Sequence, residues 1–370
     1  MHGPKRALDS RIDQLHVSAY TVPTDFPESD GTLQWDKTTI VIVEPSAAGR
    51  RGLGYTYADT SVATLIHSKL RDVVIGCDAM NVPETFLRML RSLRNLGRPG
   101  IVSMAISAVD IALWDLKAKI LDLPLTRLLG AVRDSIAIYA SGGFTSYSDE
   151  QLRDQLGGWA DRGFSMMKMK IGREPGRDLH RVRVARKAVG DHAALFVDAN
   201  GAYSRKQALA FARRFQQEFD VRWFEEPVSS DDLEGLRLIR NDGPPGMDIA
   251  AGEYGYDPFY FRRMLDAEAV DILQADATRC GGVTGFIDVD AQCLARPIPL
   301  SAHTAPSIHM HLCCVARAAR NLEYFHDHQR IERIFFDGFV EPHNGFLRPS
   351  LSRHGLGLEL RRSDIQKFAA

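Results

Sequence analysis

The sequence has few cysteines, and they are not spaced as pairs. The five are Cys77, Cys280, Cys293, Cys313 and Cys314. Their number is odd, and no two of them form a Cys-x-x-Cys pair. This pattern argues against a disulfide framework and against a zinc–thiolate site. The adjacent Cys313 and Cys314 are expected to be buried in a helix.

The sequence also lacks an excess charge of either sign and a long apolar run. It has 46 basic and 47 acidic residues, for a formal net charge of −1, which argues against nucleic-acid and membrane-surface partners. No apolar run reaches the roughly 18–20 residues that span a bilayer. Residues 1–14 are polar, without the apolar core of a signal peptide. We therefore expect a cytoplasmic protein.

Low-complexity tracts, heptad runs and long charge blocks are also missing, so the chain is expected to be globular throughout. Its 370 residues exceed one average domain. This length favours two domains, or one large barrel with an added module.

The first third of the sequence predicts an α+β module that ends near residue 130. The expected elements are strands at 12–22 and 38–44, a loop rich in Pro, Asp, Gly and Ser at 23–31, and helices within 61–96 and over 105–117. The two strands are rich in β-branched residues and predict an antiparallel pair.

From residue 136 onward, short apolar strands alternate with helical patterns. The strands are expected at 136–141, 166–170, 194–198, 221–225, 247–252, 269–275, 297–301 and 321–325. Eight strands separated by helices predict an α/β fold, a (β/α)7β TIM-type barrel carrying an N-terminal α+β capping domain. We expect the capping domain at 1–130, the barrel at 131–329, and a tail at about 330–370 that packs back on the capping domain.

Ionisable residues stand at the ends of seven consecutive predicted strands. They are Lys168 and Lys170, Asp198, Glu225 with Glu226, Glu253, Asp276, His303 and Glu323. A single such residue is usually solvated or caps a helix. In a barrel, however, the carboxyl ends of all strands meet at one face, where active sites lie. Seven in succession therefore predict an active site.

Three of these residues form a candidate metal site. Asp198, Glu225 and Glu253 come from adjacent strands and offer only oxygen ligands. Such a set suits a hard divalent cation, and we expect one Mg²⁺ per subunit.

Two further pairs are candidate bases. Lys168 and Lys170 are one residue apart, so they point to the same side of their strand. Two inward-facing ammonium groups are expected to lower each other's pKa, and a nearby metal ion acts in the same direction, which would make one of them a base near neutral pH. Asp276 and His303 come from neighbouring strands and could form a hydrogen-bonded dyad that provides a second base.

Four further histidines, His309, His311, His326 and His328, are expected to be packed or at the surface rather than ligands.

The order and spacing of several motifs resemble the mandelate racemase subgroup of the enolase superfamily over nearly the whole chain. The matching residues are 107–115, 124–130, Lys-Met-Lys (168–170), Asp-Ala-Asn (198–200), Glu-Glu-Pro (225–227), Ala-Gly-Glu (251–253), Asp276 with Gly-Gly-Val-Thr-Gly (281–285), His303 and Glu323. The resemblance implies that the carboxylates at 198, 225 and 253 bind Mg²⁺, with Asn200 and Glu226 beside them.

The resemblance also implies roles for the remaining strand-end residues. Lys170 would be the base on one face of the substrate, with Lys168 next to it and touching the substrate carboxylate. His303, oriented by Asp276, would serve the other face, and a protonated Glu323 would hydrogen-bond the same carboxylate. Such members abstract an α-proton through an enediolate. Relatives of this kind are often homo-oligomers, from dimers to octamers.

Within this subgroup we expect an acid sugar dehydratase. A racemase or epimerase of a 2-hydroxy acid is the alternative, and a non-catalytic binding relative is the third hypothesis. Residues 24–36 are acidic with no cation before Lys37, and residues 54–59 carry none. A second substrate carboxylate would need a basic partner, so a monocarboxylic sugar acid is favoured over an aldarate. The candidate substrate contacts are Asp25, Trp35, Tyr55, Tyr139 and Ser141.

Overall fold

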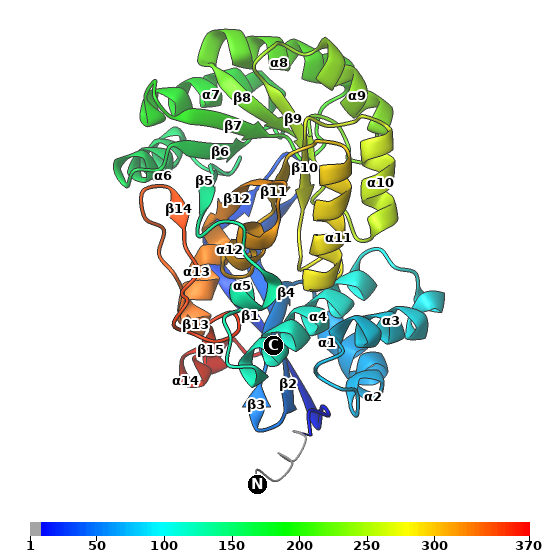
Figure 1. Cartoon of the computed structure of the whole chain (residues 1–370). Helices are drawn as coiled ribbons and strands as arrows, with labels where there is room; N and C mark the ends of the chain where they lie inside the picture. The colour runs from blue at the N-terminus through cyan, green and yellow to red at the C-terminus, as the bar shows by residue number, and fades with distance from the viewer. Residues whose placement is uncertain (1–8) are drawn as a thin grey trace.

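The structure, a computed structural model, describes residues 9–370. An antiparallel sheet with its helices lies beside a ring of parallel strands surrounded by helices (Figure 1). This arrangement confirms the α/β fold predicted from the sequence, a parallel barrel with an N-terminal cap.

Eight parallel strands form the barrel, close to the predicted positions. They are β5 (Ile136–Gly142), β6 (Met166–Lys170), β7 (Ala194–Asp198), β8 (Val221–Glu225), β9 (Asp248–Ala251), β10 (Ile272–Ala275), β11 (Leu300–Ala302) and β12 (Ala319–Phe325). Neighbours in sequence pair with one another, and β12 pairs with β5. The sheet is therefore closed, without free edges within the barrel.

A helix follows each barrel strand. The helices are α6 (Asp149–Asp161), α7 (Pro175–Val189), α8 (Arg205–Phe219), α9 (Leu233–Asp242), α10 (Pro258–Asp266), α11 (Gly282–Ala295), α12 (Pro306–Val315) and α13 (His326–Phe335). Ser148 and Ser204 cap α6 and α8 with reciprocal bonds to Gln151 and Gln207. Such capping boxes define where the helices begin.

Large side chains fill the inside of the barrel. Tyr139, Phe196 and Trp223 pack together there with Ala250 and Ile272. The rings of Phe196 and Trp223 are stacked, with their centroids 5.1 Å apart. The barrel is thus a packed core that leaves only its mouth for a ligand.

The N-terminal part is an antiparallel sheet covered by helices. Its strands are β1 (Gln14–Ser29), β2 (Gln34–Ala47), β3 (Arg50–Arg51) and β4 (Gly54–Tyr57), and its helices are α1 (Ser61–Leu65), α2 (Arg71–Val74), α3 (Val82–Ser92), α4 (Ile101–Ile120) and α5 (Leu125–Leu129). A π-helical turn at Ile66–Leu70 joins α1 to α2, and a 3-10 turn at Arg94–Leu96 follows α3.

The long helix α4 joins this part to the barrel helix α11. Asp110 accepts hydrogen bonds from the backbone N–H and the hydroxyl of Thr284, at 3.0 and 2.7 Å. Ser107 Oγ accepts from the Gly281 N–H at 2.8 Å, and Trp114 donates to Thr284 at 3.0 Å. These buried and partly buried bonds hold the cap at one orientation on the barrel.

The expected loop at 23–31 is wrong. β1 continues to Ser29, and β2 begins at Gln34, so the two strands form one long hairpin. A register shift between Pro23 and Glu28 absorbs the two prolines, after which pairing resumes. The hairpin tip rests on the barrel, where Ser29 Oγ lies 2.6 Å from Thr145 Oγ1. Turn-forming residues here bend a strand instead of ending it.

After α13 the chain contacts both parts of the molecule. β14 (Phe346–Leu347) pairs antiparallel with β5, and β13 (Phe336–Asp337) pairs with β15 (Glu359–Leu360). After α14 (Arg362–Ile365) and the 3-10 turn Gln366–Phe368, Ala369 forms a bridge with Tyr20 of β1. The C-terminal segment thus lies against the cap.

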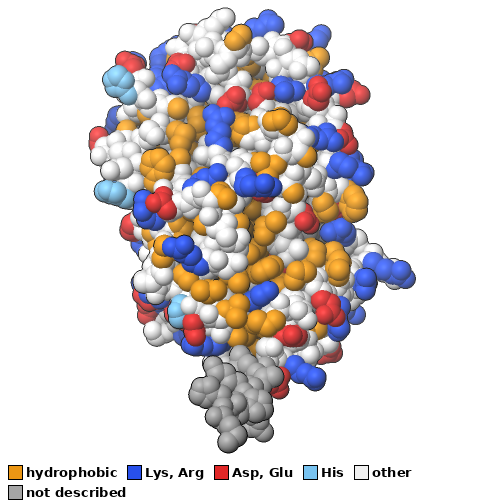
Figure 2. All heavy atoms as spheres, in the orientation of Figure 1, with side chains coloured by type: hydrophobic (Ala, Val, Ile, Leu, Met, Phe, Trp, Pro, Cys, Tyr) orange, Lys and Arg blue, Asp and Glu red, His pale blue; other side chains and the backbone are white. Residues whose placement is uncertain are grey.

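None of the helices in residues 9–370 has the length and apolar character that a membrane span requires. Figure 2 shows Lys and Arg side chains interspersed with Asp and Glu over the visible face. Charges of one sign therefore do not gather there into a block.

Candidate active site

The carboxyl ends of the barrel strands open into a cavity of about 370 Å³ between barrel and cap. The strand register places Lys170 opposite Asp198, and Asp198 opposite Glu225. From the cap, the turn between β1 and β2 contributes Asp30 and Leu33 to the lining. β2 contributes Trp35, Lys37, Thr38 and Thr39, and β4 with the loop after it contributes Tyr57, Ala58 and Asp59. The cavity therefore exists only where the two parts meet.

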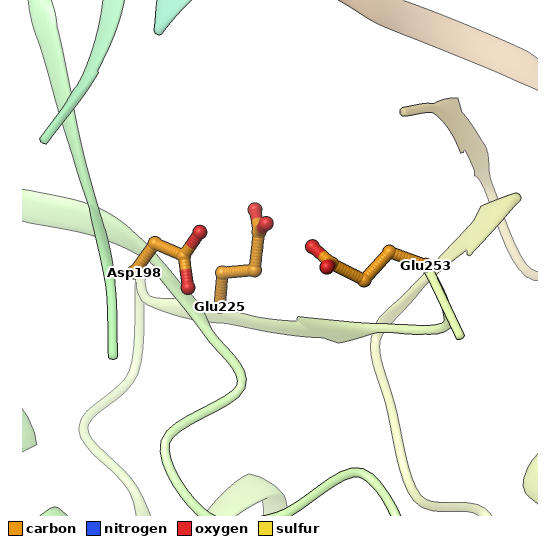
Figure 3. Close-up of side chains that lie close together, drawn as sticks. All are labelled: Asp198, Glu225 and Glu253. Atoms are coloured by element: carbon orange, nitrogen blue, oxygen red, sulfur yellow. The ribbon is translucent and has the colours of Figure 1, made fainter. Parts of the chain in front are cut away.

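Three carboxylates converge at the barrel side of this cavity. One oxygen each of Asp198, Glu225 and Glu253 lies within 4.8 Å of the others, and all three residues are buried (Figure 3). Within residues 9–370, Glu253 Oε2 has no hydrogen-bond partner. Three convergent oxygen donors, one of them unsatisfied, fit Mg²⁺ with positions left open for a substrate.

Neighbouring groups orient these carboxylates. Trp223 donates from Nε1 to Glu225 Oε2 at 3.0 Å, and the Asn200 N–H donates to Asp198 Oδ1 at 2.9 Å. Asn200 and Glu226 have positive φ values of 46° and 37°, a strained conformation that is common in active sites. Burial raises the pKa of Glu226, and the nearby Glu253 carboxylate raises it further.

Lys168 and Lys170 both bind these carboxylates. Lys168 Nζ lies 2.5 Å from Glu225 and 2.9 Å from Glu323, and Lys170 Nζ lies 2.6 Å from Asp198 Oδ2. Burial lowers the pKa of both ammonium groups, but the carboxylates, Glu225 foremost for Lys168 and Asp198 for Lys170, bring the net shift above the ordinary value. The nearby acids thus outweigh the mutual repulsion of the two ammonium groups.

Glu323 is ionised in this arrangement, whereas a protonated side chain was expected. Burial raises its pKa, but Lys168 and then His303 lower it, to about 2 overall. A carboxylate that accepts from a buried ammonium group keeps its charge.

The structure brings His303 and Asp276 together across neighbouring strand ends. His303 Nδ1 lies 2.9 Å from Asp276 Oδ2, while Asp276 Oδ1 accepts from the Thr278 N–H at 2.7 Å. Burial raises the pKa of Asp276, but the bond to His303 outweighs it and brings the pKa below its usual range. His303 Nε2 lies 3.4 Å from Glu253 Oε2, so the imidazole faces the carboxylate triad.

Of the five expected substrate contacts, the structure places only Trp35 in the cavity lining. Tyr139 lies in the barrel interior, and Ser141 is buried on the same strand. Asp25 is exposed and lies 3.5 Å from Arg330. Tyr55 is buried and donates to Glu332 Oε1 at 2.7 Å.

Several lining residues were not expected as substrate contacts, among them Lys37, Tyr57, Tyr254, Arg279 and His328, the last of which was expected to be packed or at the surface. Arg279 is partly buried, and its Nη1 donates to the Glu253 carbonyl at 3.1 Å. Tyr57 follows Tyr55 by two residues on β4, yet only Tyr57 lines the cavity. His309, expected to be packed, is buried and accepts from the Ala277 N–H at 2.8 Å.

Trp35 is held by a buried acid, which leads to a pH prediction. Glu28 Oε2 accepts from Trp35 Nε1 at 2.8 Å. Burial, then Asp327, raises the pKa of Glu28 to about 8. The folded protein therefore holds a proton that the unfolded chain has lost above its ordinary pKa of 4.5. The contribution of protonated Glu28 to the free energy of unfolding is therefore fully present below pH 4.5, and it is lost as the pH rises to about 8.

We expect Glu28→Gln to remove this loss. Relative to the parent, the variant gains stability with rising pH by at most about 1.4 kcal/mol per pH unit. Urea unfolding at pH values between about 5 and about 8 measures the difference, with the exposed Glu150→Gln as control. If the free energy of unfolding changed with pH in the same way for the parent and for Glu28→Gln, Glu28 would have the same pKa in the folded protein as in the unfolded chain.

Comparison with known families covers both parts of the chain. Residues 16–130 match the mandelate racemase / muconate lactonizing enzyme N-terminal domain, and residues 151–364 match the enolase C-terminal domain-like family. The crystal structure of a mandelate racemase/muconate lactonizing enzyme-like protein from Rubrobacter xylanophilus is similar, with TM-score 0.96 and 55% identity over 97% of this chain and 100% of that chain.

Two curated relatives are named for activities. The L-talarate/galactarate dehydratase of Salmonella typhimurium is 31% identical over 95% of this chain and 89% of its own length. Its structure with Mg and L-lyxarohydroxamate has TM-score 0.89 and 28% identity, covering 100% of this chain and 96% of that chain. The 3,6-anhydro-alpha-L-galactonate cycloisomerase of Streptomyces coelicolor is 32% identical over 81% of this chain and 84% of its own length. The chain therefore belongs to the mandelate racemase/muconate lactonizing enzyme family of the enolase superfamily.

Proposed function

We propose that this protein is an Mg²⁺-dependent acid sugar dehydratase that converts a monocarboxylic sugar acid to a 2-keto-3-deoxy acid. The observation that carries the proposal is that Lys170, at the end of β6, and His303, directly after β11, line one cavity with Glu253 of the carboxylate triad. The dehydratase name of the Salmonella relative, and its structure with Mg and a sugar-acid hydroxamate, support the same reaction class.

The chemistry needs strong electrostatic help, because an α-proton beside a carboxylate is a very weak acid. When bound to the triad, Mg²⁺ would neutralise negative charge that develops on the substrate carboxylate. Lys168 adds a fixed positive charge that is already oriented by Glu225 and Glu323. Groups held in place before the reaction do not have to reorganise during it.

Lys170 and His303 have complementary parts in the elimination. With Asp198 engaged by Mg²⁺, the ion pair that raises the pKa of Lys170 would be weakened, so that Lys170 would be available as the neutral amine. The amine takes the α-proton, the electrons of that C–H bond form the C2–C3 double bond, and the C3–O bond breaks. His303 donates a proton from Nε2, so that the hydroxyl leaves as water, and the resulting enol becomes the 2-keto acid. Asp276 accepts from His303 Nδ1 at 2.9 Å and orients the ring for this transfer.

The charge at the cap end of the cavity favours a single substrate carboxylate. Lys37 lines the cavity there, but Asp30 and Asp59 line it as well. Arg279 lies 3.6 Å from Glu253 and 3.7 Å from Asp276, so its charge is already matched. A second carboxylate would meet more acid than base at this end.

Racemisation or epimerisation of a 2-hydroxy acid is the second candidate, since two bases in one cavity can act on the same carbon from opposite faces. Proton NMR in D₂O with Mg²⁺ distinguishes the reactions across a library of aldonic and aldaric acids. Partly deuterated 3-deoxy methylene signals are expected. Loss of the α-proton signal without them would replace dehydration by racemisation. Unchanged spectra for every acid in the library would favour the third hypothesis, a non-catalytic binding relative.

We expect Glu253→Gln to weaken Mg²⁺ binding by about 100-fold, because it removes one of three anionic ligands. Isothermal titration calorimetry with MgCl₂ measures the affinity. The matched control is Glu234→Gln, at an exposed site on α9. An affinity equal to that of the parent would remove Glu253 from the ligand set.

A further inference from the structure

His328 is a buried imidazole in the cavity wall that the reaction described above does not use. It stands in the first turn of α13 and lines the cavity. Its ring stacks on Tyr57 of the cap, with centroids 3.4 Å apart and planes 11° apart, and the ring of Phe325 meets it edge-on at 5.1 Å. Two aromatic neighbours from different parts of the molecule therefore hold its plane.

The hydrogen bonds of His328 determine which nitrogen carries the proton. The Ala305 N–H donates to Nδ1 at 3.4 Å, and an acceptor Nδ1 requires the proton on Nε2 in a neutral ring. Burial, and then the neighbouring His303, lowers the pKa of His328. Within residues 9–370, its bonds use Nδ1 and the backbone carbonyl, which leaves Nε2–H for an occupant of the cavity.

A buried carboxylate holds the stacking partner of this ring. Glu332 Oε1 accepts from the hydroxyls of Tyr55 at 2.7 Å and Tyr57 at 3.3 Å, and Glu332 Oε2 accepts from the Ser307 N–H at 2.9 Å. The Tyr57 hydroxyl also lies 3.3 Å from the His328 carbonyl. The donor is thus positioned before any ligand arrives, which lowers the entropy cost of binding.

We infer that His328 is a substrate-binding residue whose Nε2–H donates to a hydroxyl of the substrate chain, making the cavity selective for polyhydroxylated acids. This inference rests on the proposed function, in which the substrate carboxylate lies at the triad. A neutral donor matches a neutral hydroxyl. An apolar chain at the same place would leave the buried N–H without a partner, which is the type of contact that discriminates strongly.

The test compares ligands that share the metal-binding group and differ in the chain. Calorimetry in saturating Mg²⁺ uses acetohydroxamate, which has no hydroxyl chain, and the four D-pentonohydroxamates. In the parent, the best pentonohydroxamate is expected to bind more tightly than acetohydroxamate. His328→Phe keeps a stacked ring but loses the donor. This variant should bind that pentonohydroxamate about 10-fold more weakly than the parent does, and its affinity for acetohydroxamate should be unchanged.

Two further variants separate donation from packing. His328→Gln places an amide N–H near the Nε2 position and should recover part of the lost affinity, and His326→Phe, two residues earlier, should match the parent. The inference is overturned if His328→Phe loses affinity equally for the pentonohydroxamate and for acetohydroxamate. It is also overturned if the parent binds no pentonohydroxamate more tightly than acetohydroxamate. Absence of acetohydroxamate binding to the parent overturns the proposed metal site itself.

A direct readout does not depend on ligands. ¹⁵N NMR of histidine-labelled protein, with the His328 signals assigned by their loss in His328→Gln, should show a protonated Nε2 and an unprotonated Nδ1. Protonation at Nδ1 overturns the inference.

Discussion

Replacing Lys170 with alanine is expected to lower kcat/KM by roughly 10³-fold or more, since a positioned base contributes about 10²–10⁴-fold. Its Nζ lies 2.6 Å from Asp198 Oδ2, and the side chain reaches the cavity beside the triad. The amine is therefore next to the site where a substrate α-carbon would lie. Mg²⁺ affinity should stay near that of the parent, because all three carboxylates remain.

Turnover by NMR in D₂O and calorimetry with MgCl₂ measure the two effects separately. Lys206→Ala, at an exposed position of α8, is the matched control and should behave like the parent. His303→Ala should also abolish turnover, because the elimination needs both groups. If either variant kept parent activity, the assignment of Lys170 and His303 as base and acid would fail.

Replacing Lys168 with methionine is expected to destabilise the metal-free protein by about 3–5 kcal/mol, the cost of removing one partner from a buried ion cluster. Lys168 is completely buried, and its Nζ lies within 3.2 Å of oxygens from Asp198, Glu225 and Glu323. Without the ammonium group, Glu225 and Glu323 lose this buried counter-charge, and Asp198 keeps only Lys170. Methionine preserves much of the side-chain volume, so the loss is electrostatic.

Saturating Mg²⁺ should restore part of this stability, since a ligand of the folded state at about 100 times its Kd contributes about 2.7 kcal/mol. Urea unfolding in EDTA and in excess Mg²⁺ tests the prediction, with Lys206→Met as control. A Lys168→Met variant as stable as the parent in EDTA would show that the carboxylates are neutralised by protonation.

The barrel and its strand-end residues were predictable because both follow from local pattern. Lys170, Asp198 and Glu225 each end a short apolar segment, and parallel strands bring such ends into one layer. The order of the family motifs along the chain then indicated a role for each of these residues. What lies opposite them was not predictable, since the cavity lining depends on how the cap is placed on the barrel. Tyr55 and Tyr57 illustrate this limit, because only Tyr57 reaches the cavity.

The ionisation states of the buried lysine and glutamate side chains could not be predicted from the sequence either. Lys168 and Glu323 lie far apart in the chain, and their 2.9 Å contact appears only when β12 closes the barrel beside β5. That contact lowers the pKa of Glu323 and raises that of Lys168. Two lysines considered by themselves predict the opposite shift, because repulsion between neighbours is visible in a sequence and distant counter-charges are not.

The carboxylate of Glu332 has a consequence for protein engineering. It holds Tyr55, Tyr57 and the Ser307 backbone from behind the cavity wall, without lining the cavity itself. Variation around Glu332 would tilt the Tyr57–His328 stack without replacing any group that moves a proton. A library built at such outer positions could retune which acids are accepted while the reaction itself is preserved, a safer starting point than randomising the cavity lining.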